Sequence, residues 1–474
     1  MEIRTGASKH LGQTPGTADI VDFAPDHKTA LTLVTPQLSD SNLYLTDLPT
    51  GEASLLTPHR GPANIRGARF APDSSTIYLS SNLDSDFVHF ARMKLSANRT
   101  PGAIEVLAAR ADADLEWFDV GEDGRRAVLF WNVAGRCEMD FVDLKSGKLT
   151  KGPVLPGETI DGPMFSRDGR TLVSSFSGAA LPWNLWVLGP GRRSFQQLTW
   201  SPHAGVRLEE LVRPGLLRFR GEDGLPLSGW LYRAPASPSR GAVVISFHGG
   251  PESQERPYIN DTYQALLIRG ISVFAPNVRG SSGFGKAFVN LDNGPLRVNA
   301  VRDIGGCVRA VVDAGVADPG RIGVMGGSYG GYMTMAALTE FPELFAAGAD
   351  LFGIVNFETF FAHSEPWMSA VSKVEYGDPE TQRDLLRALS PIHRIDRVRA
   401  PTLVLHGAND TNVPVVEAEQ VVAELRKRRV PVELILFPDE GHGFVKTANR
   451  IRATREIVRW FVLHLQETRA GNLR

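Results

Sequence analysis

A serine, a histidine and an aspartate in three separate stretches carry the residue types that nucleophilic catalysis needs. Ser328 stands in Gly326-Gly327-Ser328-Tyr329-Gly330, which fits G-x-S-x-G and lies between an apolar run and a helical pattern. Glycines two residues before and after the serine allow a strand and a helix to approach closely at a sharp turn. The N-terminus of the following helix favours negative charge beside the hydroxyl. This stretch therefore predicts a nucleophilic serine.

A serine hydroxyl needs a base to take its proton and a carboxylate to orient that base. The predicted base is His442, which lies between two glycines after the last apolar strand. His363, His393 and His406 are its rivals. His406 falls in or at the end of a strand, where a structural histidine is typical, and His393 falls in a connecting segment. His363 could line a cleft.

The predicted acid is Asp410, which directly follows the apolar strand near 402–406. Asp350 competes with it, because it ends the strand after the helix that follows Ser328. Asp439 is too near His442 in sequence to orient its ring easily. A tetrahedral intermediate also needs two hydrogen-bond donors for its oxygen. We expect them to be the backbone N–H groups of Tyr329 and of Gly250, in His248-Gly249-Gly250-Pro251.

The composition of the chain argues against nucleic-acid binding, a membrane span, a disulfide framework and a metal site. The chain has 474 residues, 42% of them hydrophobic and 22% charged, with a formal net charge of −2. This charge implies no nucleic-acid partner, and no apolar run predicts a membrane span or a signal segment. Two cysteines, Cys137 and Cys307, argue against a disulfide framework and favour the cytoplasm. No cofactor is expected, and no pair of the C-x-x-C kind predicts a metal site.

The first half of the chain contains a repeat. Phenylalanines that each precede a turn and a new strand recur every 47 or 48 residues, at Phe23, Phe70, Phe118 and Phe165. This period is typical of a β-propeller with WD40-like or TolB-like repeats, about four blades of which are visible. A β-sandwich array is the rival interpretation, and whether the propeller is complete stays open. The nearby tryptophans, Trp117, Trp131, Trp183 and Trp186, are expected in blade cores.

The second half alternates apolar strands with helical patterns. A hairpin is expected around 221–224, and helices are expected near 261–269, 299–315, 415–428 and 449–466. Such alternation predicts a doubly wound, mostly parallel sheet, with its site beyond the carboxyl ends of the strands. The expected domains are therefore a β-propeller over residues 1–205 and an α/β-hydrolase over residues 206–474.

Taken together, these motifs resemble the prolyl oligopeptidase family of serine peptidases, nearer its acylaminoacyl-peptidase and dipeptidyl-peptidase branches. The resemblance rests on the propeller and on five ordered motifs, which are His248 to Pro251, Asn277 to Gly285, Gly326 to Tyr332, Asp410 to Pro414 and Gly441 to Phe444. It implies a triad of Ser328, Asp410 and His442, an oxyanion hole from Tyr329 and Gly250, and contacts to substrate from Asn412, Val413, Phe357 and Ile354. It also implies a supporting or helix-start role for Asp303.

The resemblance implies hydrolysis of amide bonds in short peptides through an acyl-enzyme. A carboxylesterase with the same triad is one alternative, and a non-catalytic propeller scaffold is another. The propeller is shorter than is usual for the family. P1 preference and exo- or endopeptidase action stay open, as does a homo-oligomeric state.

Overall fold

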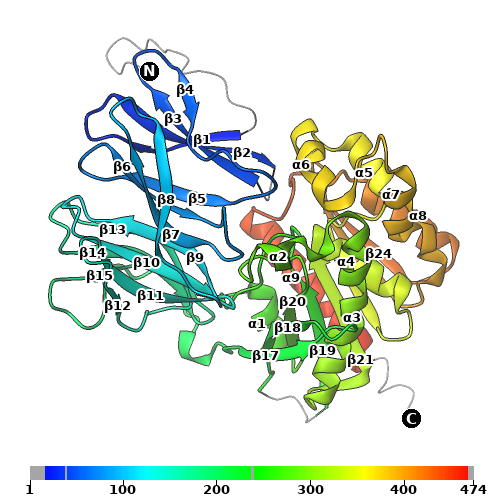
Figure 1. Ribbon diagram of the computed structural model, residues 1–474. Helices are drawn as coiled ribbons and strands as arrows, with labels where there is room; N and C mark the ends of the chain where they lie inside the picture. The colour runs from blue at the N-terminus through cyan, green and yellow to red at the C-terminus, as the bar shows by residue number, and fades with distance from the viewer. Residues whose placement is uncertain (1–16, 38–39, 236–239, 468–474) are drawn as a thin grey trace. The chain divides into compact units, whose positions relative to one another are not determined.

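A computed structural model describes residues 17–37, 40–235 and 240–467. The chain forms two compact units (Figure 1). One contains the described residues up to Gly205 together with Gly283–Ala287, and the other contains Val206–Ser282 and the residues from Phe288 onward.

The first unit contains four antiparallel sheets of four strands each, which are the blades of a β-propeller. The strands of the first two sheets are β1 (Thr17–Phe23), β2 (Thr29–Gln37), β3 (Asp40–Asp47), β4 (Ala53–Leu55), β5 (Ile65–Phe70), β6 (Thr76–Ser81), β7 (His89–Leu95) and β8 (Pro101–Ala108). Those of the other two are β9 (Asp114–Val120), β10 (Arg126–Val133), β11 (Arg136–Asp143), β12 (Leu149–Lys151), β13 (Thr159–Phe165), β14 (Leu172–Gly178), β15 (Leu181–Leu188) and β16 (Gln196–Gln197).

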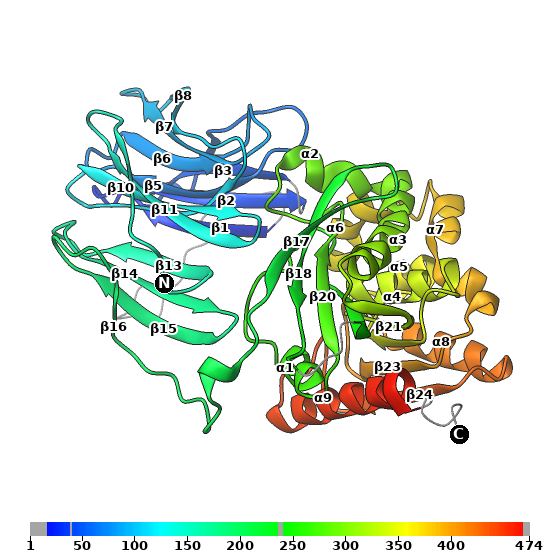
Figure 2. The same ribbon diagram turned by 90° about the horizontal axis from the view of Figure 1, so that it is seen from below.

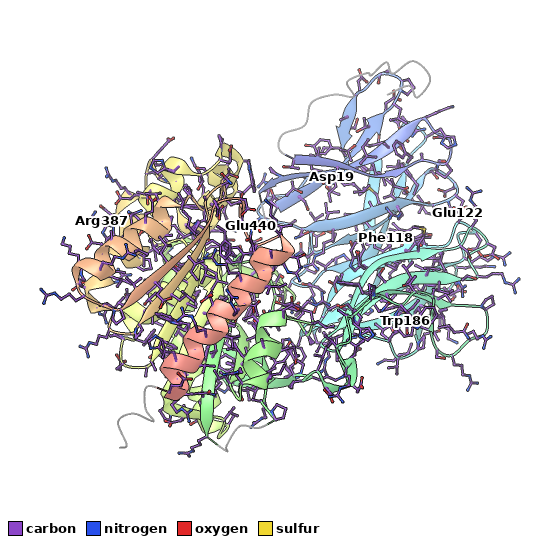
Figure 3. The ribbon with its side chains drawn as sticks, turned by 180° about the vertical axis from the view of Figure 1, so that it is seen from behind. Asp19, Phe118, Glu122, Trp186, Arg387 and Glu440 are labelled. Carbon is purple, nitrogen blue, oxygen red and sulfur yellow. The ribbon has the colours of Figure 1, made fainter. Side chains whose placement is uncertain are left out.

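The repeating phenylalanines fall at or near the end of the first strand of each sheet, so the 47- or 48-residue period is the blade period. Phe118, labelled in Figure 3, packs against Phe90 of the preceding blade with ring centroids 5.2 Å apart. Apolar clusters of this kind join each blade to the next. The expectation that all four tryptophans lie in blade cores is wrong: Trp131 is buried, but Trp117 and Trp183 are 39% and 49% exposed.

The second unit is built on one eight-stranded sheet of order β17-β18-β20-β19-β21-β22-β23-β24. The strands β17 and β18 pair antiparallel, as do β18 and β20, and every later pair is parallel. The predicted α/β-hydrolase class is therefore confirmed, with a propeller before it. The strands are β17 (Gly215–Arg220), β18 (Pro226–Tyr232), β19 (Gly241–Phe247), β20 (Ser272–Asn277), β21 (Ala317–Gly327), β22 (Ala347–Leu351), β23 (Thr402–Gly407) and β24 (Val432–Phe437).

Helices cover both faces of this sheet. α1 packs against α9 on one face, whereas α3, α4 and α8 lie on the other (Figure 2). Buried apolar side chains fill the layer between α3, α4, α8 and the strands. The helices are α1 (Asp261–Ile268), α2 (Lys286–Val289), α3 (Arg297–Asp313), α4 (Tyr329–Glu340), α5 (Phe357–His363), α6 (Pro366–Tyr376), α7 (Arg383–Leu389), α8 (Val416–Lys427) and α9 (Thr447–Val462), which continues as a π-helical turn (Leu463–Glu467). Short 3₁₀ turns lie at Leu208–Glu210, Asn290–Asp292, Gly294–Leu296 and Pro391–Arg397.

Candidate active site

Ser328 occupies the turn between β21 and α4 in a conformation that a residue with a side chain rarely adopts. Its φ is 57° and its ψ is −119°. The two flanking glycines make this turn sterically feasible. A Cβ on Gly326 would lie 2.4 Å from the carbonyl oxygen of Gly330, and one on Gly330 would lie 2.1 Å from that of Phe247. The glycine pattern thus lets β21 and α4 meet closely enough to expose the serine hydroxyl.

The structure brings Ser328, His442 and Asp410 together. The Nε2 atom of His442 lies 3.0 Å from Oγ of Ser328, and its Nδ1 atom lies 2.8 Å from Oδ2 of Asp410. Ser328 follows β21, Asp410 follows β23 and His442 follows β24, so the three lie beyond the carboxyl ends of parallel strands of one sheet, in which β22 separates β21 from β23. This geometry lets the imidazole accept the serine proton and pass it on.

Asp410 is held by its own loop. Its Oδ1 atom accepts hydrogen bonds from the backbone N–H groups of Asn412 and Val413, each at 2.9 Å. The other oxygen, Oδ2, therefore stays directed at His442. Asp410 is 7% exposed, so its charge acts on the imidazole through little solvent.

Two residues fix the loop that carries His442. Glu440, labelled in Figure 3, accepts hydrogen bonds from the backbone N–H groups of Val445 and Lys446 at 3.1 and 2.9 Å. Phe352 lies edge-on against the imidazole of His442, with ring centroids 5.0 Å apart. Sequence reasoning missed Phe352, and nothing in its local pattern indicates this contact.

The loop that should supply the second oxyanion donor lies directly against Ser328. A Cβ on Gly249 would lie 3.1 Å from the carbonyl oxygen of Gly327 and 3.5 Å from Cβ of Ser328, so the glycine lets this loop run close beside the turn of the nucleophile. Gly250, the predicted donor, follows with φ at 49°. Nε2 of His248 lies 2.9 Å from Oγ of Ser281, which joins this loop to the segment after β20. Burial lowers the pKa of His248, so its ring is neutral at pH 7.

Tyr329, whose N–H is the other predicted donor, has its side chain in a buried charged cluster that the sequence did not reveal. Its hydroxyl donates to Oδ2 of Asp292 at 3.4 Å, and its ring lies 4.9 Å from Cζ of Arg297. Arg297 also pairs with Glu375 at 2.5 Å. Burial raises the pKa of Asp292 to about 7, and burial beside Glu375 raises that of Glu252 to about 9. This cluster holds the first turn of α4 in place behind Ser328.

The predicted substrate contacts differ in their surroundings. Ile354, Phe357 and Val413 are at most 3% exposed and belong to the same apolar cluster as Tyr329. Asn412 is partly buried, and its carbonyl oxygen accepts a hydrogen bond from Ser364 at 3.0 Å. All four stay predicted substrate contacts.

None of the rival residues, all of them in the described part of the chain, hydrogen-bonds the hydroxyl of Ser328, although Nε2 of His406 lies 3.6 Å from Oδ2 of Asp410. The carboxylate of Asp439 pairs with Lys446 at 2.6 Å, His393 lies 3.7 Å from Glu358, and His363 ends α5. Asp350 is 1% exposed, and burial raises its pKa to about 8, which makes it neutral at pH 7.

Asp303 lies within α3, six residues after its start at Arg297, so the helix-start alternative is wrong. Its carboxylate accepts a hydrogen bond from Nε of Arg279 at 2.7 Å, and the supporting role stays a prediction. Over residues 17–37, 40–235 and 240–467 there is no group of three or more histidine, cysteine, aspartate or glutamate side chains arranged to hold a metal ion. Within the same residues, no helix is both long enough and apolar enough to cross a membrane.

Residues 258–468 match the model of the prolyl oligopeptidase family. The resemblance inferred from the motifs is therefore confirmed for this part of the chain.

Curated proteins that are similar to this chain are named as an aminopeptidase and as an acylamino-acid-releasing enzyme. Dipeptidyl aminopeptidase BIII of Pseudoxanthomonas mexicana is 38% identical over 212 residues, which are 44% of this chain and 31% of that protein. An acylamino-acid-releasing enzyme of Arabidopsis thaliana is 29% identical over 226 residues, 46% of this chain and 30% of that protein. The chain spans less than half the length of these relatives.

Solved structures share the fold. A puromycin-hydrolyzing peptidase of Mycobacterium tuberculosis superposes with a TM-score of 0.85 over 96% of this chain and 70% of that one, at 21% identity. An acylaminoacyl peptidase of Pyrococcus horikoshii gives a TM-score of 0.66 over 95% of this chain and 89% of that one, at 18% identity.

Proposed function

We propose that this chain, whose C-terminal part matches the prolyl oligopeptidase family, is a serine peptidase that hydrolyses amide bonds in short peptides. One observation carries the proposal: a single imidazole, that of His442, lies 3.0 Å from a serine hydroxyl and 2.8 Å from a buried carboxylate. Hydrogen-bond contact among a nucleophile, a base and an acid is what acyl transfer requires.

In this proposal Ser328 attacks the scissile carbonyl carbon, and His442 takes the hydroxyl proton. Asp410 orients the imidazole and stabilises the imidazolium. The N–H groups of Tyr329 and Gly250 bind the oxyanion of the tetrahedral intermediate. His442 then gives its proton to the leaving amine, the C–N bond breaks, and water hydrolyses the acyl-enzyme by the reverse sequence of proton transfers.

The substrate class follows from the family resemblance and from the names of the relatives. We expect short peptides with an uncharged P1 residue, N-acylated peptides among them. Ile354, Phe357, Val413 and Asn412 are the proposed contacts. We further propose that residues 1–205 and 206–474 act as separate propeller and hydrolase domains in the cytoplasm, and a homo-oligomer is compatible with this assignment.

Turnover of an acyl-aminoacyl p-nitroanilide compared with that of a p-nitrophenyl ester tests the proposal. A peptidase cleaves both, and Ser328→Ala cleaves neither. Brisk ester hydrolysis without anilide hydrolysis would instead identify a carboxylesterase. Loss of both activities in the wild-type chain would favour a non-catalytic scaffold.

A further inference from the structure

A cavity of about 410 Å³ opens beside Ser328 inside the second unit. Such a volume falls in the range of about 300–1,000 Å³ that is typical of ligand sites. Its walls include Ser328 and Gly249 together with Glu255 and Tyr263. The triad chemistry does not use Glu255 or Tyr263.

The cavity adjoins both Ser328 and the imidazole of His442. Phe352 forms part of its wall and also contacts the imidazole of His442, with ring centroids 5.0 Å apart. His442 delivers the proton to the departing amine, so the leaving group must lie next to this imidazole. The side chain of Tyr329, in contrast, enters the apolar cluster under α3 and α4, where the proposed P1 contacts Ile354 and Phe357 lie.

One carboxyl group sets the chemistry of the cavity. Glu255 is 3% exposed, and its Oε1 atom has no hydrogen-bond partner among the described residues. No lysine or arginine occurs among the described residues that line the cavity. A buried carboxyl without a counter-charge is costly, and burial raises the pKa of Glu255 to about 8. A cationic group entering this cavity would displace the proton and supply the missing charge.

Other parts of the wall fit the stem of such a group. Leu351, Phe352 and Ile457 offer apolar surface for a chain of methylenes. Tyr258 and Tyr263 line the same cavity as Glu255. Aromatic rings beside a carboxylate suit an ammonium or guanidinium head group.

We propose that this cavity binds the residue on the leaving-group side of the scissile bond, P1′, and that Glu255 selects lysine or arginine there. This inference rests on the proposed peptidase function. It makes the enzyme selective for the residue after the cleaved bond, because the proposed P1 contacts Ile354, Phe357 and Val413 do not line this cavity.

Partition of the acyl-enzyme tests P1′ binding directly. The enzyme is acylated with a p-nitrophenyl ester, and amino-acid amides compete with water for the acyl group. The added amine attacks the acyl carbon, the ester bond to Ser328 breaks, and the amine proton passes through His442 to Oγ of Ser328. The yield of the new amide relative to the free acid reports how well each amide occupies the cavity, independently of the rate of acylation.

Lysine amide and norleucine amide form the matched pair, since norleucine keeps the apolar stem but lacks the ammonium group. At about pH 9, where Glu255 is ionised, we expect lysine amide to give about tenfold more transfer product, the effect of one charge-assisted hydrogen bond. In Glu255→Gln the ratio should fall to about one. Glu222→Gln is the control: it makes the same change at an exposed site outside the cavity and should keep the wild-type ratio.

Equal transfer to the two amides by the wild-type enzyme would overturn the inference, even if Glu255→Gln did not fold. A preference that persists in Glu255→Gln would overturn the role of Glu255. Absence of any acyl-enzyme would instead overturn the proposed function, so the two failures are distinguishable.

Discussion

The Oδ2 atom of Asp410 lies 2.8 Å from Nδ1 of His442 and 3.6 Å from Nε2 of His406. The Nε2 atom of His406 lies 2.9 Å from the carbonyl oxygen of Val413, so it carries a proton and donates it there. Burial lowers the pKa of His406, which keeps this ring neutral. Asp410 therefore has one imidazole to orient and to stabilise as a cation, that of His442.

Replacing Asp410 with Asn should abolish most turnover. An amide NH₂ facing Nδ1 of His442 would stabilise the tautomer whose Nε2 carries the proton, and this tautomer cannot accept from Ser328. We expect kcat for an acyl-aminoacyl p-nitroanilide to fall by about 10³- to 10⁴-fold. Asp439→Asn, which changes an acid in the His442 loop that pairs with Lys446, is the control and should stay within about threefold of wild type. Comparable losses in both variants would contradict the assignment of Asp410.

Asp350 should control stability rather than catalysis. Its pKa of about 8 exceeds the ordinary value of 3.8 for an aspartate, so between these pH values the unfolded chain has released a proton that the folded chain retains. Stability should therefore fall by up to about 1.4 kcal/mol per pH unit across this window and level off above it. Asp350→Asn removes this dependence, so its thermal midpoint should rise relative to wild type more at pH 8 than at pH 5.

Two comparisons make this test specific. Asp313→Asn, at the exposed end of α3, should show no such change between the two pH values. Asp350→Asn should also retain kcat, because the native side chain is already uncharged at neutral pH. A large loss of kcat with unchanged folding would contradict this prediction and indicate that Asp350 is the catalytic acid.

The triad residues could be predicted because each one lies in the loop that follows an apolar strand. Parallel strands of one sheet place their carboxyl ends at the same edge. Residues that follow β21, β23 and β24 in the sequence can therefore be expected to lie close together in space. The spacing of Phe23, Phe70, Phe118 and Phe165 likewise revealed the blades, because every blade repeats the same turn.

The supporting contacts could not be predicted in this way. His248 meets Ser281 across 33 positions and Arg297 meets Glu375 across 78, and neither pair follows a period. The prediction that Trp117 and Trp183 lie in blade cores was wrong for a related reason. Their strands expose one face, and hydrophobic type alone does not tell which face a residue occupies.

A methyl group on Gly330 should disrupt the turn that holds Ser328. An ideal Cβ there would lie 2.1 Å from the carbonyl oxygen of Phe247, in the backbone of β19, which cannot rotate away. We expect Gly330→Ala to destabilise the second unit by about 1–3 kcal/mol in urea unfolding and to lower kcat in the fraction that folds. Gly215→Ala is the control, since a Cβ there meets no atom within 4 Å. Equal stability of the two variants would contradict the close approach.

Removal of the Ser281 hydroxyl should loosen the loop that carries Gly250. Oγ of Ser281 lies 2.9 Å from Nε2 of His248, and Nδ1 of the same ring lies 3.0 Å from the carbonyl oxygen of Gly249. Ser281→Ala therefore removes the contact that ties the ring, and the loop with the expected oxyanion donor, to the segment after β20. We expect kcat to fall about tenfold with KM little changed, since the donor acts mainly in the transition state. The neighbouring Ser282→Ala is the control and should keep both parameters. A rise in KM alone would show that Ser281 acts on substrate binding instead.

The central claim is that Ser328 is a nucleophile activated by His442, and the site of covalent labelling by a fluorophosphonate tests it most directly. Mass spectrometry of the digested protein should find one adduct per chain, on the peptide that contains Ser328. Ser328→Ala should give no adduct, and His442→Ala should react at least about 10³-fold more slowly. Stoichiometric labelling of Ser328→Ala, or an adduct at another residue of the wild-type chain, would contradict the account.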